Sequence, residues 1–164
     1  MPWLSINLFT AFLAGGVVYL FQHTIQHTLA LAVWMPVIAG MGGNAGTQAL
    51  AVTVRRLALG LIPANHFTRV VGKEVVVGIT NGFVMGLAVA TAAALLGQGP
   101  RLGIVVFLAM VGNLMVAGFA GAFIPILLER LGVDPAVASS IFVTTFTDVC
   151  GFILLLGLAG TILL

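Results

Sequence analysis

Asp148 is the residue best placed for chemistry in this sequence, because it is an acid in the middle of a long apolar stretch. A carboxylate at the centre of a membrane costs at least about 2.5 kcal/mol, and such residues usually face a cavity or an ion path. Thr144 and Thr145 place two hydroxyls within about one helical turn of it. We therefore predict that Asp148 binds a cation. The alternative is a protonated side chain that only hydrogen-bonds to another helix.

A glycine-rich segment, residues 40–48, is the second place where polar groups fall inside an apolar stretch. It carries Asn44, Thr47 and Gln48 among its glycines. Glycines weaken a helix, and carbonyls freed from the helical ladder are tolerated at membrane depth only where protein or water satisfies them. We predict a broken or bent helix that binds ions. The alternative is a tight packing bend in which Asn44 and Gln48 hydrogen-bond between helices.

The oxygen donors of these two segments suit a hard cation. Mg²⁺ usually keeps several waters and binds through one or two carboxylates. One chain supplies a single Asp148, whereas a two-fold homodimer would bring two copies to its axis and neutralise a divalent ion. Soft metals are disfavoured because Cys150 is the single thiol. The residue chemistry predicts a channel or transporter that prefers divalent cations.

His23 and His27 have the spacing of two metal ligands on one helical face. A zinc site needs at least a third protein ligand, and the neighbouring sequence offers none. We therefore expect an ordinary polar segment at the membrane boundary.

Five apolar stretches must position these residues. Of the 164 residues, 6% are charged and 61% are hydrophobic, whereas an ordinary soluble domain is roughly 25% charged. A transmembrane helix needs about 20 apolar residues, so we predict an all-α membrane protein with one pore domain over residues 1–164 and no soluble regulatory domain. Its five transmembrane helices are expected at residues 3–21, 29–59 (broken), 70–96, 102–128 and 136–164. The six Lys and Arg form no basic tract, which argues against nucleic-acid binding.

The positive charges predict the orientation of the chain in the membrane. Arg101 falls alone on one side, whereas the other Lys and Arg surround the loops that follow the second and fourth stretches. Since Lys and Arg in short loops stay cytoplasmic, we expect the N-terminus in the cytoplasm and the C-terminus outside.

Three local patterns predict how the helices meet and begin. Gly78, Gly82 and Gly86 repeat every four residues, which allows another backbone to approach closely. Asn113 is expected to hydrogen-bond between helices. Asp134, followed by a proline, is expected to cap the last helix.

The sequence as a whole resembles the transmembrane domain of the MgtE family of magnesium channels and transporters. The resemblance covers nearly the whole chain in order and spacing, and its most specific part is the glycine and asparagine segment. The matching motifs are PVIAGMGGNAGTQ at 36–48, then Arg55, LGVDP at 131–135 and TDV at 147–149.

The resemblance implies a homodimer of five-span subunits in a prokaryotic plasma membrane, with the pore lined by the second and fifth spans on the dimer axis. It implies that Asp148 of each subunit holds a largely hydrated Mg²⁺, helped by backbone carbonyls. The supporting pore residues would be Gly43, Asn44, Thr47, Thr144 and Thr145. Members of the family carry cytosolic domains that close the pore, and we expect this chain to be either an excised pore domain or a naturally short member.

Together these features predict a Mg²⁺-selective channel or transporter that moves the hydrated ion through a dimeric pore. Two alternatives remain: an ion-coupled divalent cation antiporter, and a non-transporting membrane assembly subunit in which Asp148 only joins helices. An enzyme is not expected, because an aspartyl mechanism needs two carboxylates and a serine mechanism needs a base beside its nucleophile.

Overall fold

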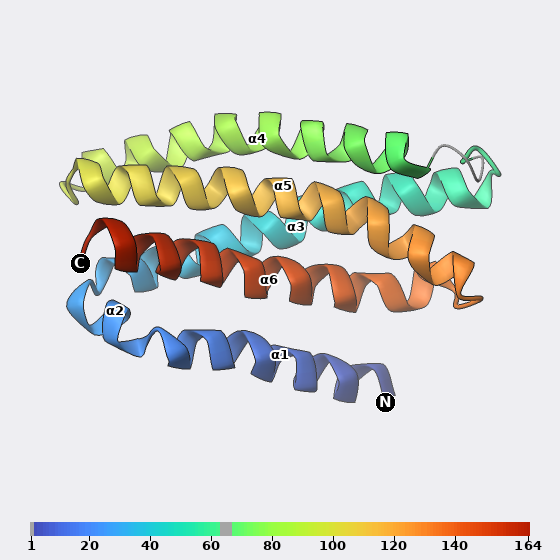
Figure 1. Ribbon diagram of the computed structural model, residues 1–164, viewed down its shortest axis with the longest axis horizontal. Coiled ribbons are helices and arrows are strands. Elements are labelled where there is room, and N and C mark those ends of the chain that lie inside the picture. Colours follow the sequence, from blue (N-terminus) through green and yellow to red (C-terminus); the bar gives the residue numbers. More distant parts are fainter. Residues whose placement is uncertain (1, 63–66) are drawn as a thin grey trace.

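The computed structural model describes residues 2–62 and 67–164 and consists of helices joined by short turns (Figure 1). These described residues contain no β-strand. The helices are, in chain order, α1 (Pro2–Leu20), α2 (Gln22–His27), α3 (Ala30–Ala58), α4 (Phe67–Leu95), α5 (Pro100–Arg130) and α6 (Pro135–Ile162). The axes of the five long helices are roughly aligned, successive long helices run in opposite directions, and the two termini lie at opposite ends of the bundle (Figure 1).

Within the described ranges, three helices are long and apolar enough to cross a membrane: Phe67–Leu95, Pro100–Arg130 and Ser139–Ile162. α1 contributes a shorter apolar helix, Leu4–Leu20. Large apolar side chains, among them Phe12 and Phe83, lie exposed on the exterior, as expected where the surrounding solvent is lipid. The prediction of an all-helical membrane protein is confirmed at this level, and the number of five spans stays a prediction.

α3 is one uninterrupted helix, so the prediction of a break within residues 40–48 is wrong. The glycines stay helical because Gly42 and Gly46 are buried against other helices. A Cβ at Gly46 would lie 2.6 Å from Cγ1 of Val143 on α6, and a Cβ at Gly42 would collide with the Asn113 amide on α5. Close packing thus offsets the roughly 1 kcal/mol per residue by which glycine disfavours a helix.

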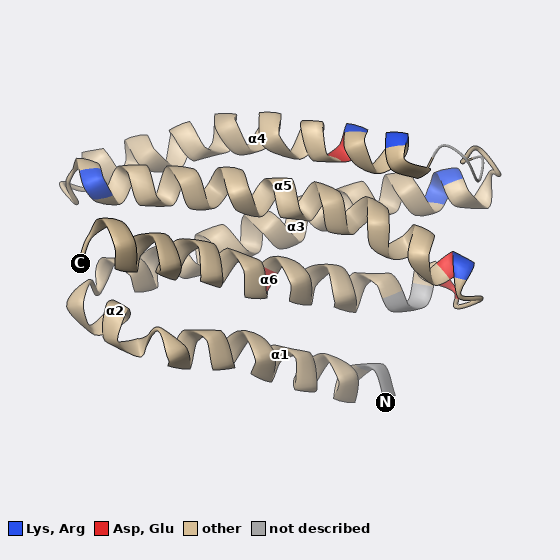
Figure 2. Cartoon of the chain, viewed as in Figure 1, with Lys and Arg blue, Asp and Glu red and all other residues tan. Residues whose placement is uncertain are grey.

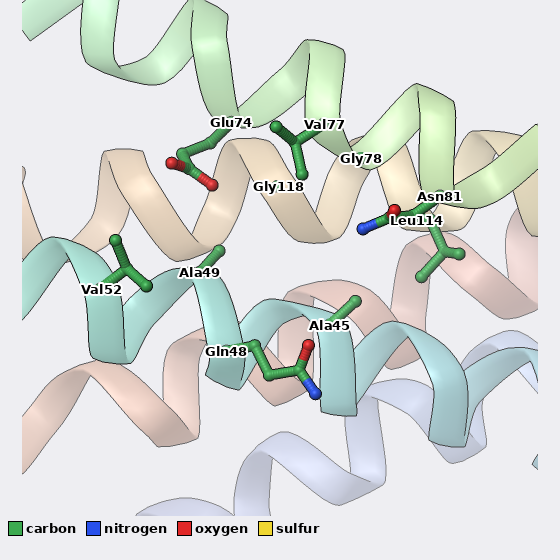
Figure 3. Close-up of a pocket in the computed structure, with 10 residues that line it drawn as sticks. All are labelled: Ala45, Gln48, Ala49, Val52, Glu74, Val77, Gly78, Asn81, Leu114 and Gly118. Atoms are coloured by element: carbon green, nitrogen blue, oxygen red, sulfur yellow. The ribbon is translucent and has the colours of Figure 1, made fainter.

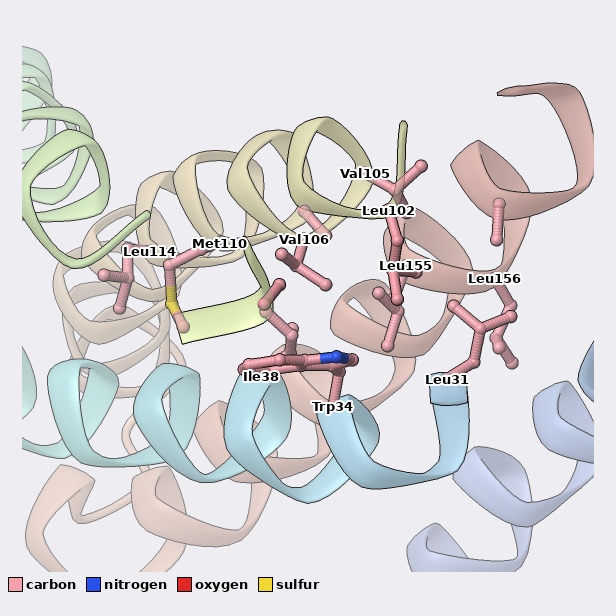
Figure 4. Packing of buried hydrophobic residues seen from close by; sticks show 13 residues of the cluster. Leu31, Trp34, Ile38, Leu102, Val105, Val106, Met110, Leu114, Leu155 and Leu156 are labelled. Carbon is pink, nitrogen blue, oxygen red and sulfur yellow. The ribbon is translucent and has the colours of Figure 1, made fainter. Parts of the chain in front are cut away.

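α5 lies at the centre of the bundle, with α4 on one side and α3 and α6 on the other. An apolar cluster that includes Ile38, Met110 and Leu155 fills the space between α3, α5 and α6 (Figure 4). At its edge, Trp34 Nε1 donates a hydrogen bond to Gln98 Oε1 at 2.7 Å. This cluster holds α3 and α6 side by side and so fixes the spacing of the two segments that carry the candidate ligands.

The seam between α4 and α5 confirms the packing predicted for Gly78, Gly82 and Gly86, all of which are buried. A Cβ at Gly82 would lie 2.8 Å from Cα of Val111, and one at Gly86 would lie 3.0 Å from Cδ2 of Phe107. A Cβ at Gly78 would collide with a backbone carbonyl of α5. Glycine here lets two backbones touch.

The turn between α5 and α6 also agrees with the sequence prediction. Gly132 has a φ of 74°, a left-handed conformation that glycine adopts without steric cost. Asp134 precedes Pro135 at the start of α6, and its Oδ1 accepts a hydrogen bond from the backbone N–H of Ala136 at 2.9 Å. The predicted N-cap is confirmed.

Positively charged residues gather at one end of the bundle (Figure 2). Arg101 begins α5 at the other end. The gathered residues lie where α3 and α5 end and where α4 begins: Arg55, Arg56, Arg69, Lys73 and Arg130. The folded chain therefore keeps the charge asymmetry on which the predicted orientation depends.

Candidate ion-binding face

Asp148 lies in the middle of α6, where it is the single acidic residue of the helix (Figure 2). It is half-buried. Among the described residues, none forms a hydrogen bond or an ion pair with its carboxylate. A carboxylate left in this state at mid-helix needs water, a cation or another chain to stabilise its charge.

Two side chains share the face of α6 that carries Asp148. Thr144 and Ser140 precede it by one and two turns at intervals of four residues, so all three lie along one side of the helix. The Thr144 hydroxyl donates to the carbonyl oxygens of Ser140 at 2.9 Å and Ile141 at 3.1 Å. A hydroxyl that donates its proton in this way keeps its oxygen lone pairs for a cation.

α3 runs beside this face and carries two exposed amide side chains in the same stretch of helix. A Cβ at Gly43 would lie 4.0 Å from Cγ2 of Thr144, so the two helices meet at this pair. Asn44 and Gln48 are exposed on α3 and are four residues apart. We call the set of Asn44, Gln48, Ser140, Thr144 and Asp148 the polar face.

The two remaining predicted pore residues, Thr47 and Thr145, have different surroundings. The Thr47 hydroxyl donates to the carbonyl oxygens of Gly43 and Asn44, both at 2.9 Å, on the segment that adjoins the polar face. Thr145 lines an apolar pocket of about 380 Å³ between α1, α5 and α6, together with Phe142 and Phe146 among others. The structure thus groups Thr47 with the polar face and places Thr145 on another side of α6.

Asn113 links the helices that build the polar face. It is fully buried, and its Nδ2 donates to the carbonyl oxygen of Ile38 at 2.8 Å. Its amide packs against Gly42 of α3, and a Cβ at Gly151 of α6 would lie 2.8 Å from its Nδ2. The predicted interhelical hydrogen bond is confirmed between α5 and α3, and packing of the same amide against Gly151 holds α6 close to both.

The sequence interpretation missed two polar residues near this site. Asn7 of α1 and Ser140 line a pocket of about 230 Å³ together with Thr144. The spacing of Ser140 from Asp148, two turns on the same face, was a signal that could have identified it. No comparable pattern points to Asn7, because its proximity depends on how α1 docks on α6.

The histidine pair does not extend into a metal centre within the part of the chain that the structure describes. His23 and His27 are exposed, and their Nε2 atoms lie 3.3 Å apart. No group of three His, Cys, Asp or Glu side chains in the described ranges could hold a metal ion.

Comparison with known proteins adds independent information. The family profile for MgtE, described as a divalent cation transporter, matches residues 35–158, which include most of α3 and all of α4 and α5. The magnesium transporter MgtE of Enterococcus faecalis is 36% identical to this chain over 160 residues, which are 98% of this chain and 35% of that protein.

Two further relatives show the same coverage. The magnesium transporter MgtE of Bacillus subtilis is 33% identical over 159 residues, or 97% of this chain and 35% of that protein. The Thermus thermophilus magnesium transporter MgtE is 34% identical over 161 residues, or 98% of this chain and 36% of that protein. The chain thus spans about a third of the length of these curated relatives, which are named as transporters and not as enzymes. The matched segment includes Asp148 and the glycine-rich part of α3, and the chain belongs to the MgtE family of divalent cation transporters.

Proposed function

We propose that this chain moves hydrated Mg²⁺ across a membrane through a pore formed between two copies, with Asp148 as the selectivity site. The observation that carries the proposal is the unpaired, half-buried carboxylate in the middle of α6, on a face lined by hydroxyls and amides. Such a donor set suits a hard cation that retains part of its water shell.

The polar face supports a homodimer. Exposed Asn44 and Gln48 would meet lipid if the chain stood alone, at a cost that membrane helices usually avoid. A second copy related by a two-fold axis covers this face and brings a second Asp148 to the axis. Two carboxylates then balance the charge of one divalent ion, and the waters that Mg²⁺ retains occupy the space between the subunits.

Each subunit would cross the membrane with five spans, α1, α3, α4, α5 and α6, and the second and fifth of these, α3 and α6, would line the pore. The clustered Lys and Arg at one end of the bundle support an orientation with that end, and with it the N-terminus, in the cytoplasm of a prokaryotic cell. The C-terminus then lies outside.

The test is Mg²⁺ uptake into liposomes that contain the purified protein and a Mg²⁺-sensitive dye. We expect Asp148→Asn to reduce the initial rate at least about tenfold, equivalent to about 1.4 kcal/mol, because the neutral amide no longer balances the charge of the ion. Asp134→Asn removes an acid from the turn but keeps an N-cap, and it should leave the rate unchanged. Equal rates for Asp148→Asn and the parent protein would contradict the assigned site.

Two controls separate the alternatives. Uptake that requires an imposed Na⁺ or proton gradient would identify an ion-coupled antiporter. No uptake by the parent protein, combined with a large loss of stability in Asp148→Asn, would identify a structural subunit.

A further inference from the structure

A further cavity, lined mainly by apolar groups but with three polar side chains, lies away from α6, between α3, α4 and α5 (Figure 3). Its volume is about 180 Å³, and since a water molecule occupies about 30 Å³ in the liquid, it admits several waters. Its polar lining comes from Glu74 and Asn81 of α4 and Gln48 of α3. Figure 3 shows the side chain of Glu74 extending from α4 towards α3.

Glu74 is the charged group of this cavity. It is half-buried, and no described Lys or Arg lies within ion-pair distance of its carboxylate. Lys73, the next residue in the sequence, is exposed on the neighbouring side of α4. The position of Glu74 is fixed by the α4–α5 seam, because Gly118 of α5 packs directly against the Glu74 backbone carbonyl.

The donors around the cavity match the chemistry of a hydrated divalent cation. A carboxylate supplies the charge, and the side-chain oxygens of Gln48 and Asn81 are hard neutral ligands. The volume leaves space for the waters that such an ion keeps when a protein offers one carboxylate. An unpaired carboxylate in a partly buried cavity attracts a cation more strongly than one on an open surface.

We propose that this cavity is a second binding site for a hydrated divalent cation, with Glu74 as its charged ligand and Gln48 and Asn81 as neutral ligands. The site is separate from Asp148 and does not depend on the proposed pore. Gln48 belongs to both the polar face and the cavity, so the two sites share a wall of α3.

The experiment counts Mn²⁺ ions bound to the full chain in detergent by electron paramagnetic resonance. We expect Glu74→Gln, which keeps the shape of the side chain, to remove the cavity site while the Asp148 site remains. Asp148→Asn should remove the other site, and the double variant should remove both. Glu129→Gln changes an exposed acid at the end of α5 and should leave binding unchanged.

A second variant tests the cavity itself. Val77 is 42% exposed and lines the space, so Val77→Phe fills it while keeping the Glu74 carboxylate and should weaken the cavity site about tenfold. Unaltered Mn²⁺ binding in both Glu74→Gln and Val77→Phe would overturn the proposal. Displacement of Mn²⁺ by Na⁺ as readily as by Mg²⁺ would overturn its divalent character. If Asp148→Asn bound as many Mn²⁺ ions as the parent protein while Glu74→Gln lost one, the proposed pore site would be contradicted and the cavity site would stand.

Discussion

The α4–α5 seam and helix α3, which carries part of the polar face, both contain glycines, yet glycine serves a different purpose in each. Along α4, Gly78, Gly82 and Gly86 all point at the backbone of α5. Along α3, Gly42 and Gly46 point inward, whereas a Cβ at Gly40 would meet nothing within 4 Å. In the seam, all three glycines permit close contact between α4 and α5. In α3, Gly42 and Gly46 permit close contact with other helices, whereas Gly40 leaves one side of the helix open.

The difference shows that the spacing of glycines along a helix determines which of them contact a neighbouring helix. A strict interval of four residues keeps the glycines of α4 on one side of the helix. The denser glycines of residues 40–46 go around α3, so one of the four, Gly40, has no neighbour within 4 Å of its Cβ position. The open side of α3 carries Asn44 and Gln48, and this is where the ion chemistry is proposed.

The largest expected effect comes from disrupting the seam. Gly78→Val should lower the free energy of unfolding by about 3 kcal/mol, because its Cβ would collide with the Leu114 carbonyl, which belongs to a backbone that cannot move aside. Denaturant titration in detergent, followed by circular dichroism, measures the change. Gly72→Val is the matched control on the same helix, since nothing lies within 4 Å of its Cβ. Equal losses in the two variants would mean that the seam is not closely packed.

The next effect concerns the link between α5 and the polar face. Asn113→Ala should cost about 2 kcal/mol, because it removes a buried hydrogen bond to Ile38 and leaves a small cavity beside Gly42 and Gly151. The same denaturant titration measures it. Asn81→Ala, an exposed asparagine in the middle of α4, should cost much less. A loss in Asn113→Ala no larger than that in Asn81→Ala would show that the hydrogen bond does not hold the helices together.

A third prediction compares one variant on each of two sides of α6. Thr144→Val should slow Mg²⁺ uptake into liposomes about fivefold, equivalent to about 1 kcal/mol, because it removes a hydroxyl oxygen from the polar face. Thr145→Val makes the same chemical change in the apolar pocket and should alter uptake less than about twofold, or about 0.4 kcal/mol. Equal effects of the two variants would contradict the division of α6 into two sides.

The smallest effect distinguishes the two kinds of glycine within α3. Gly40→Ala should leave stability unchanged or raise it by up to about 1 kcal/mol, because alanine favours a helix and the site has space. Gly42→Ala should destabilise the protein, since its Cβ would collide with Asn113. Thermal unfolding of the two variants side by side measures the contrast. Destabilisation by Gly40→Ala as large as that by Gly42→Ala would show that a Cβ at position 40 meets a neighbour, against the open space at this side of α3.

Much of the fold was predictable because membrane helices leave strong signals. The stretch predicted at 29–59 closely matches α3, and the glycine spacing in α4 and the cap at Asp134 were predicted correctly. The break that we predicted in α3 was wrong, because glycine content measures only the local preference against a helix. The contacts of Gly42 and Gly46 that keep it helical come from α5 and α6, far away in the sequence.

The sequence by itself determined that the chain is helical and apolar, that Asp148 stands without another acid in α6, and that the chain belongs to the MgtE family. Only the tertiary structure decided which oxygen donors share a face with Asp148 and that Glu74 lines a cavity with Gln48. The reason is physical. Helical periodicity places residues around one helix, but which helix faces them depends on how close the backbones can pack, and here glycine and Asn113 contacts between distant segments set that distance.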